Sequence, residues 1–143
     1  MALNPYLTQA RGAAMLDSVV DALDTGGAGS LKFYTTAQAA TANTALGAQI
    51  LLATLTFSAT AFGAATTADP SVATAAAITS DSSADATNTV AWCRWANGSA
   101  TTILDCSAGI SSGVFDVEFN TDAFVTGATV SVTALTVTMP LHI

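Results

Sequence analysis

The spacing of apolar residues changes once along this chain, and that change limits the fold more than any other feature. In residues 9–24 the apolar side chains recur at helical spacing, which predicts one amphipathic helix that ends at Gly26-Gly27. From Ser30 onward the period is two, and no helical segment separates the expected strands. The core side of the helix is expected to carry Leu16, Val19, Val20 and Leu23, and its polar side Asp17, Asp21 and Asp24.

The period-two region predicts an all-β domain. The expected strands are Leu31–Thr35, Gln49–Phe57, Val72–Ile78, Thr89–Trp95, Thr101–Cys106, Val114–Phe119 and Thr129–Met139. Ala37–Gly47 is either a loop or a short helix, and its lack of a clear period favours the loop. Roughly seven or eight short strands between turns are typical of a β-sandwich, here one of jelly-roll type. The domain division is therefore 1–28 for an extended N-terminal arm and helix, and 29–143 for the β-sandwich.

Side-chain parity assigns an inner face to several strands. In Gln49–Phe57 the inner set is Leu51, Ala53, Leu55 and Phe57. In Val114–Phe119, Asp116 and Glu118 are expected to face water, so that Phe115, Val117 and Phe119 face inward. Phe124 is a candidate plug, and a swap of parity near Ala134 indicates a bulge or a change of sheet.

Asn97-Gly98 is the strongest hairpin signal, because this pair favours a two-residue type I′ turn. That turn would place Cys93 opposite Thr102 and Cys106 opposite Thr89. The two thiols would then lie roughly 13 Å apart along the ladder, beyond disulfide reach. We therefore expect two free thiols, as in a reducing cytosol. Trp92 and Trp95 have opposite parity, which predicts one core residue and one partly exposed partner anchor.

Charged residues are scarce, at 9% of the chain, and the net charge is −7. The only basic residues are Arg11, Lys32 and Arg94, too few to bind nucleic acid or an anionic membrane surface. A surface with so few hydrated ions is easily desolvated, which favours burial in an assembly. The longest apolar run, at residues 50–53, is too short to span a membrane, and no signal peptide is expected.

Residues that could support chemistry are few. His142 is next to the C-terminus, a poor place for a general base, and Asp116 and Glu118 lie on one strand rather than across a cleft. Residues 80–85 hold Asp81 and Asp85 among serines, which suits either calcium or an ordinary turn. Cys93 is expected to be a buried, inert thiol. We therefore expect no catalytic residues, no metal and no cofactor, and a protein that is not an enzyme.

Several stretches resemble small virion proteins of tailed bacteriophages. They are residues 15–17, 50–57, 61–65, 75–87 and 130–140. The resemblance implies a jelly-roll capsid cement or decoration protein, which binds the outside of the shell and ties together subunits of the major capsid protein. It implies no catalytic residues. It places the protein on the capsid surface of a virion assembled in the host cytoplasm. Another virion component (head fibre, neck or tail) is the alternative, and a carbohydrate-binding β-sandwich is a third.

The arm at residues 1–8 is the expected partner contact. It is uncharged and carries Leu3, Tyr6 and Leu7, which have no obvious place in a sandwich core. We expect it, with the exposed side of the helix, to contact the shell or a neighbouring copy; a disordered arm on a monomer is the alternative. Homodimers or homotrimers are also expected, because the strand edges lack the lysines that commonly block edge pairing.

Overall fold

One helix leads into a fold that is otherwise built from short strands. The computed structural model describes residues 5–111, 113 and 115–141. Helix α1 (Gln9–Val20) continues into a 3-10 turn at Asp21–Asp24, which confirms the helix predicted over residues 9–24. The strands are β1 (Ser30–Tyr34), β2 (Leu51–Thr56), β3 (Ser71–Thr74), β4 (Asn88–Thr89), β5 (Trp92–Ala96), β6 (Thr102–Ile110), β7 (Val117–Phe119), β8 (Ala123–Phe124) and β9 (Thr136–Met139). The all-β class is confirmed, and residues 37–47 form a loop as predicted.

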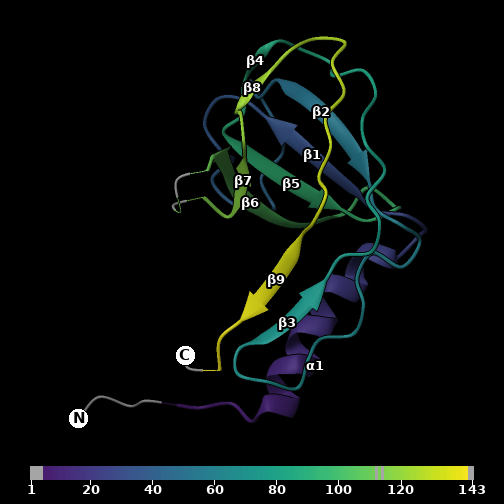
Figure 1. The fold of residues 1–143 in the computed structure, drawn as a ribbon, viewed down its shortest axis with the longest axis vertical. Helices are drawn as coiled ribbons and strands as arrows, with labels where there is room; N and C mark the ends of the chain where they lie inside the picture. Colours follow the sequence, from purple (N-terminus) through teal and green to yellow (C-terminus); the bar gives the residue numbers. More distant parts are fainter. Residues whose placement is uncertain (1–4, 112, 114, 142–143) are drawn as a thin grey trace.

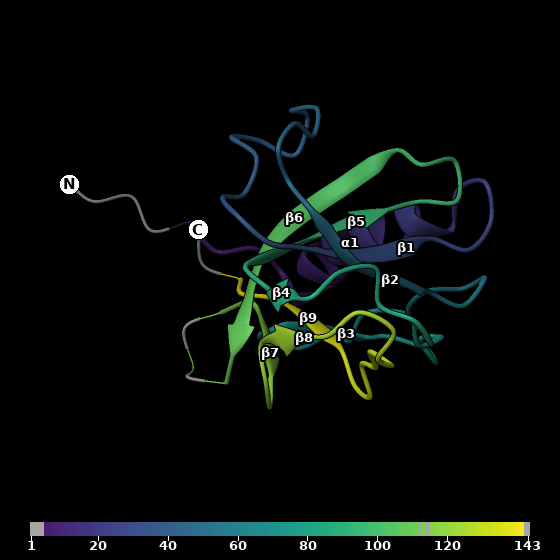
Figure 2. The ribbon, with the colours of Figure 1, turned by 90° about the horizontal axis from the view of Figure 1, so that it is seen from above.

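The strands form one curled sheet and two small ones. The large sheet has the order β2-β1-β5-β6-β7, in which β6 and β7 are parallel and the other neighbours antiparallel. The pairs β3–β9 and β4–β8 make the two-stranded sheets. The large sheet and the β4–β8 pair lie toward one end of the long axis (Figure 1), and in the view along that axis β7 and β8 lie on one side of β1 and β5 (Figure 2). At the other end of the long axis, α1 packs against β3 and β9 (Figure 1).

The core lies between the large sheet and the small ones. Phe33 in β1 meets Phe124 in β8 edge to face at 5.7 Å, and Phe124 meets Phe119 at 5.4 Å. Phe124 therefore fills the core, as predicted. Phe115 does not face inward: it is 37% exposed and its ring lies against Gly109. Of the other two residues predicted to face inward, Val117 is buried as expected, and Phe119 is half-buried with its ring against Phe33 and Phe124.

The β5–β6 hairpin is present, but its register differs from the predicted one. Cys93 lies directly opposite Cys106, because the connection runs from Asn97 to Thr101 instead of through two residues and the register shifts by one more residue between Trp95 and Ala96. The Asn97 side chain accepts hydrogen bonds from the backbone N–H of Ser99 at 3.1 Å and of Thr101 at 2.9 Å. The predicted separation of the two thiols along the ladder is therefore wrong. Both thiols are nevertheless free in the structure.

Both tryptophans are buried, so the prediction of one exposed anchor is wrong. Trp92 is 1% exposed and Trp95 is 2% exposed. They lie on opposite faces of β5, and both faces of this central strand are covered. Trp95 stacks on Phe62 in the main core at 5.7 Å, whereas Trp92 stacks on Tyr34 at 4.7 Å on the other face.

The outer edge of β2 is occupied by other parts of the same chain. The Thr54 N–H donates to the Asp81 carboxylate at 2.8 Å, and Thr56 exchanges two backbone hydrogen bonds with Thr79. The Asp85 N–H donates to the carbonyl of Leu52 at 2.8 Å. The absence of lysines therefore does not leave this edge open for pairing with another copy.

The C-terminal strand is shorter than predicted. The sequence predicts a strand over Thr129–Met139 with a bulge or a change of sheet near Ala134, but only Thr136–Met139 forms β9, while Val130 makes an isolated bridge to Asp81. The residues between them connect the bridge to Asp81 with the pairing of β9 to β3. The parity swap near Ala134 marks this change of partner.

Candidate interaction surface

Residues 5–8 of the N-terminal arm and helix α1 pack against the C-terminal segment, β3 and β9. The Leu7 N–H donates to the carbonyl of Leu141 at 2.9 Å, so this part of the arm lies along the C-terminal segment. The buried residues of α1 are Gly12, Ala13, Leu16 and Val20, and three of them recur every four positions. Gly12 fits closely, since an added Cβ would collide with the Leu141 side chain.

The neighbouring stripe of the helix is exposed and largely apolar. Met15 is 45% exposed and Val19 is 36% exposed, and Tyr6 in the arm is 62% exposed. Leu7 is half-buried beside them. A shallow hollow of about 480 Å³ runs over this region. We call this surface the arm–helix face; it consists of Tyr6, Leu7, Arg11, Ala14, Met15, Ser18, Val19 and Met139.

The predicted contact residues fall partly on this face. Tyr6 and Leu7 belong to it, and Leu3 lies outside the described residues. The prediction that Val19 faces the core is wrong, because β3 and β9 cover only the stripe that carries Leu16 and Val20. Met15 was not predicted as a contact. The four-residue spacing of Arg11, Met15 and Val19 places these residues on one side of a helix, and this spacing is the sequence signal for an exposed stripe that includes Met15.

Two aspartates of the helical segment bind backbone instead of facing water. Asp17 accepts a hydrogen bond from the Ala65 N–H at 2.7 Å, and Asp24 accepts one from the Ala61 N–H at 2.7 Å. Both carboxylates thus fix the chain that follows β2 onto the helix. Asp21 is exposed, as predicted.

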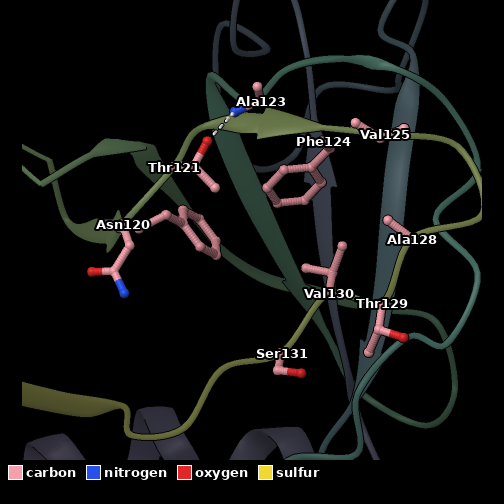
Figure 3. Close-up of a pocket in the computed structure, with 10 residues that line it drawn as sticks. Asn120, Thr121, Ala123, Phe124, Val125, Ala128, Thr129, Val130 and Ser131 are labelled. Atoms are coloured by element: carbon pink, nitrogen blue, oxygen red, sulfur yellow. Dashed lines mark hydrogen bonds between the residues drawn. The ribbon is translucent and has the colours of Figure 1, made fainter.

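A second hollow, of about 330 Å³, lies between the β7–β8 region and residues 128–131. Figure 3 shows Phe124 and Val130 on its inner wall and hydroxyl side chains toward its rim. The residues that line it provide no carboxylate, imidazole, thiol or amine. It therefore lacks the acid–base groups with which a catalytic cleft is usually recognised.

The acidic loop at residues 80–85 is organised by backbone N–H groups of the loop itself and of β2. Asp81 accepts from the N–H of Thr54 at 2.8 Å and from the N–H of Ser83 at 2.9 Å. Among the described residues, no group of three or more His, Cys, Asp or Glu side chains is arranged to hold a metal ion. The carboxylate of Asp81 is therefore occupied in joining this loop to β2. His142 lies outside the described residues.

A buried ion pair occupies the face of the large sheet that carries Trp92. Arg94 donates from Nε and Nη2 to the two carboxylate oxygens of Asp105, each at 2.7 Å, and from Nη1 to the carbonyl of Thr44 at 3.2 Å. Its guanidinium lies 5.5 Å from the centre of the Trp92 ring. The hydrogen bonds to Asp105 raise the pKa of Arg94, and burial raises the pKa of the neighbouring Tyr34. This cluster fastens the loop at residues 36–50 to the sheet and points to no substrate.

No helix in the described residues has the length and apolar character needed to cross a bilayer. No protein-family model matches the chain, and neither a curated protein nor a solved structure matches it.

Proposed function

We propose that the protein is a capsid cement protein of a tailed bacteriophage. It binds the outside of the shell and stabilises contacts between subunits of the major capsid protein. The role is structural and needs no catalytic residue, cofactor or metal. A jelly-roll sandwich is part of this proposal. The curled five-stranded sheet would be one layer of the sandwich, and the two two-stranded sheets would make up the other, smaller layer.

The arm–helix face is the observation that carries the proposal. It brings together exposed Tyr6, Met15 and Val19 on the surface of a chain in which only 9% of residues are charged. Among the residues that the structure describes, Arg11 is the only charged one that lines the hollow over the helix. Such a surface loses little hydration energy when it is covered, and burial of each large apolar side chain contributes about 1.5–3 kcal/mol.

Repetition makes modest contacts sufficient for a cement protein. Each copy that bridges two capsid subunits gains from effective concentration, so overall avidity exceeds that of one contact by about 10²–10⁴. We propose that the arm–helix face contacts the shell or a second copy within a dimer or trimer. Because the outer edge of β2 is already paired, copies associate through this face and not through that edge.

The carbohydrate-binding alternative loses its best candidate residues. Sugar platforms commonly use exposed aromatic rings, and the two tryptophans are 1% and 2% exposed. The remaining alternative, a head-fibre, neck or tail component, differs from a cement protein in copy number. Quantitative mass spectrometry of purified particles separates the two: we expect a number comparable to that of the major capsid protein. About a dozen copies or fewer would reject the cement role.

The arm–helix face is tested by Met15→Asp with Val19→Asp in one variant. Together these substitutions remove about 2–4 kcal/mol of contact energy per site, equivalent to roughly 30-fold or more in affinity. We expect a matching loss of occupancy on particles that lack the native protein. The control is Val125→Asp, which alters a more exposed apolar residue, 54% exposed, away from this face.

Deletion of residues 1–8 tests the arm separately. Circular dichroism first establishes that each variant folds. Occupancy and particle stability that stay unchanged, both in the double variant and in the deletion, would exclude the arm–helix face as the binding surface. An equal loss with Val125→Asp would show that the effect is not specific to this face.

A further inference from the structure

The two cysteines of the chain lie directly opposite each other at the centre of the large sheet. Cys93 in β5 pairs with Cys106 in β6 in the antiparallel ladder. Opposed residues of such a ladder project to the same face. Their Cα atoms are about 4.5–5.5 Å apart in either type of antiparallel pair, within the range of about 4.4–6.8 Å that a disulfide spans. A bridge between them needs no backbone rearrangement.

The two thiols differ in access to solvent. Cys93 is 0% exposed, whereas Cys106 is half-buried and lines a hollow of about 270 Å³ between the large sheet and β9. A hydrogen bond to Cys106, together with burial, raises the pKa of Cys93 well above its ordinary value. Cys93 therefore stays protonated in the reduced protein, and Cys106 is the thiol that a small reagent meets first.

We propose that Cys93 and Cys106 form a dithiol modification site that a low-molecular-weight disulfide converts into a cross-strand disulfide. The Cys106 thiolate attacks one sulfur of the small disulfide, whose S–S bond breaks and releases one small thiol. Cys93 then loses its proton and attacks the Cys106 sulfur of the mixed disulfide, which releases the second small thiol. The protein loses two electrons and two protons, and the small disulfide is reduced to two thiols.

The bridge would join β5 to β6 across the hairpin loop. It closes a ring of about 14 residues, so it restricts the unfolded chain while the folded strands already hold the required register. The oxidised protein should therefore resist unfolding better than the reduced one. This inference is independent of the proposed function, because it concerns the purified protein alone.

The experiment uses the full chain and cystamine, a small symmetrical disulfide. After oxidation, intact mass should fall by two hydrogen atoms, and titration in denaturant should find neither thiol. Peptide mapping without reductant should recover Cys93 linked to Cys106. The thermal midpoint should rise by about 6–12 °C and return to its original value after reduction with dithiothreitol.

Single variants test the order of the two steps. Cys93→Ser should stop at the mixed disulfide and keep one cysteamine on Cys106. Cys106→Ser should remain unmodified over the same period, because Cys93 is fully buried. Circular dichroism checks that both variants fold, and the peptide map of the native chain decides the main point even if they do not.

Three outcomes would overturn the proposal. The native chain could accumulate cysteamine adducts without forming a bridge. Both of its thiols could stay titratable after prolonged treatment with excess cystamine. In folded variants, Cys106→Ser could react as fast as Cys93→Ser, which would contradict the assignment of Cys106 as the attacking thiol.

Discussion

Replacement of Asp105 by asparagine should destabilise the protein far more than the loss of an ordinary surface charge. The Asp105 side chain is 2% exposed and that of Arg94 is 8% exposed, and two hydrogen bonds of 2.7 Å join them. The substitution keeps the shape of the side chain but leaves the buried guanidinium without its counter-charge. Removal of one partner from a buried pair costs about 3–5 kcal/mol, which is the loss we expect in the free energy of unfolding.

Urea unfolding with linear extrapolation measures that loss. Two further variants complete the test. Arg94→Met with Asp105→Leu removes both charges, and its stability should lie within about 1–2 kcal/mol of the native protein, since an apolar pair carries no desolvation penalty. Asp21→Asn changes an exposed aspartate and should stay within about 0.5 kcal/mol.

Hydrogen exchange adds a local readout. Arg94 also donates to the carbonyl of Thr44, so Asp105→Asn should speed exchange in the loop at residues 36–50. A loss below about 1 kcal/mol would place the pair among solvent-exposed salt bridges and refute the reasoning. A double variant less stable than Asp105→Asn would refute it as well.

Two further predictions concern packing and pH. Gly98→Ala should lower the free energy of unfolding, measured in urea, by about 1–3 kcal/mol, because the added Cβ would lie 2.5 Å from the carbonyl oxygen of Gly26. Gly63→Ala is the control and should be close to neutral, because the nearest contact of its Cβ lies at 3.9 Å. Equal effects of the two substitutions would contradict this account. The raised pKa of Cys93 lets the folded state keep a proton that the unfolded chain loses above its ordinary value of 9.0. The protonated thiol therefore adds its full contribution to the free energy of unfolding below that pH, and this contribution falls by up to about 1.4 kcal/mol per pH unit above it. The free energy of unfolding of reduced Cys93→Ala should therefore decline less steeply between pH 8 and pH 10 than that of the reduced native protein. Parallel declines would rule the thiol out as the cause.

The sequence predicts the elements whose cause is local. The helix follows from one amphipathic period, and the β5–β6 hairpin follows from two alternating runs around Asn97-Gly98. The predicted turn type is wrong, because the connection spans Asn97 to Thr101 and its residue with a positive φ is Ala100, not Gly98. Gly98 meets a different requirement, which sequence patterns do not express. The backbone of Gly26 packs where a side chain at residue 98 would stand.

Contacts between distant segments account for the other errors. The helical period predicts that Asp17 and Asp24 are solvated, but they bind N–H groups that lie 48 and 37 residues away, respectively. The same limit applies to the arm–helix face. The sequence predicts Tyr6 as a contact residue because it has no obvious place in a sandwich core. The period of the helix, however, does not tell whether a neighbouring sheet will cover the stripe of Leu16 or the adjacent stripe of Val19.

The saturated outer edge of β2 bears on how the newly made chain avoids aggregation. Proteins commonly keep edge strands from stacking into fibrils by placing lysine or proline there, and this strand carries neither. Instead, the carboxylate of Asp81 and the backbone of Thr79 take up the hydrogen-bonding groups that an incoming strand would use. A chain so poor in charge thus gains protection from ordered loops, and that protection begins only when residues 79–85 have folded onto the edge. Until then, the edge of β2 can still pair with a strand of another chain.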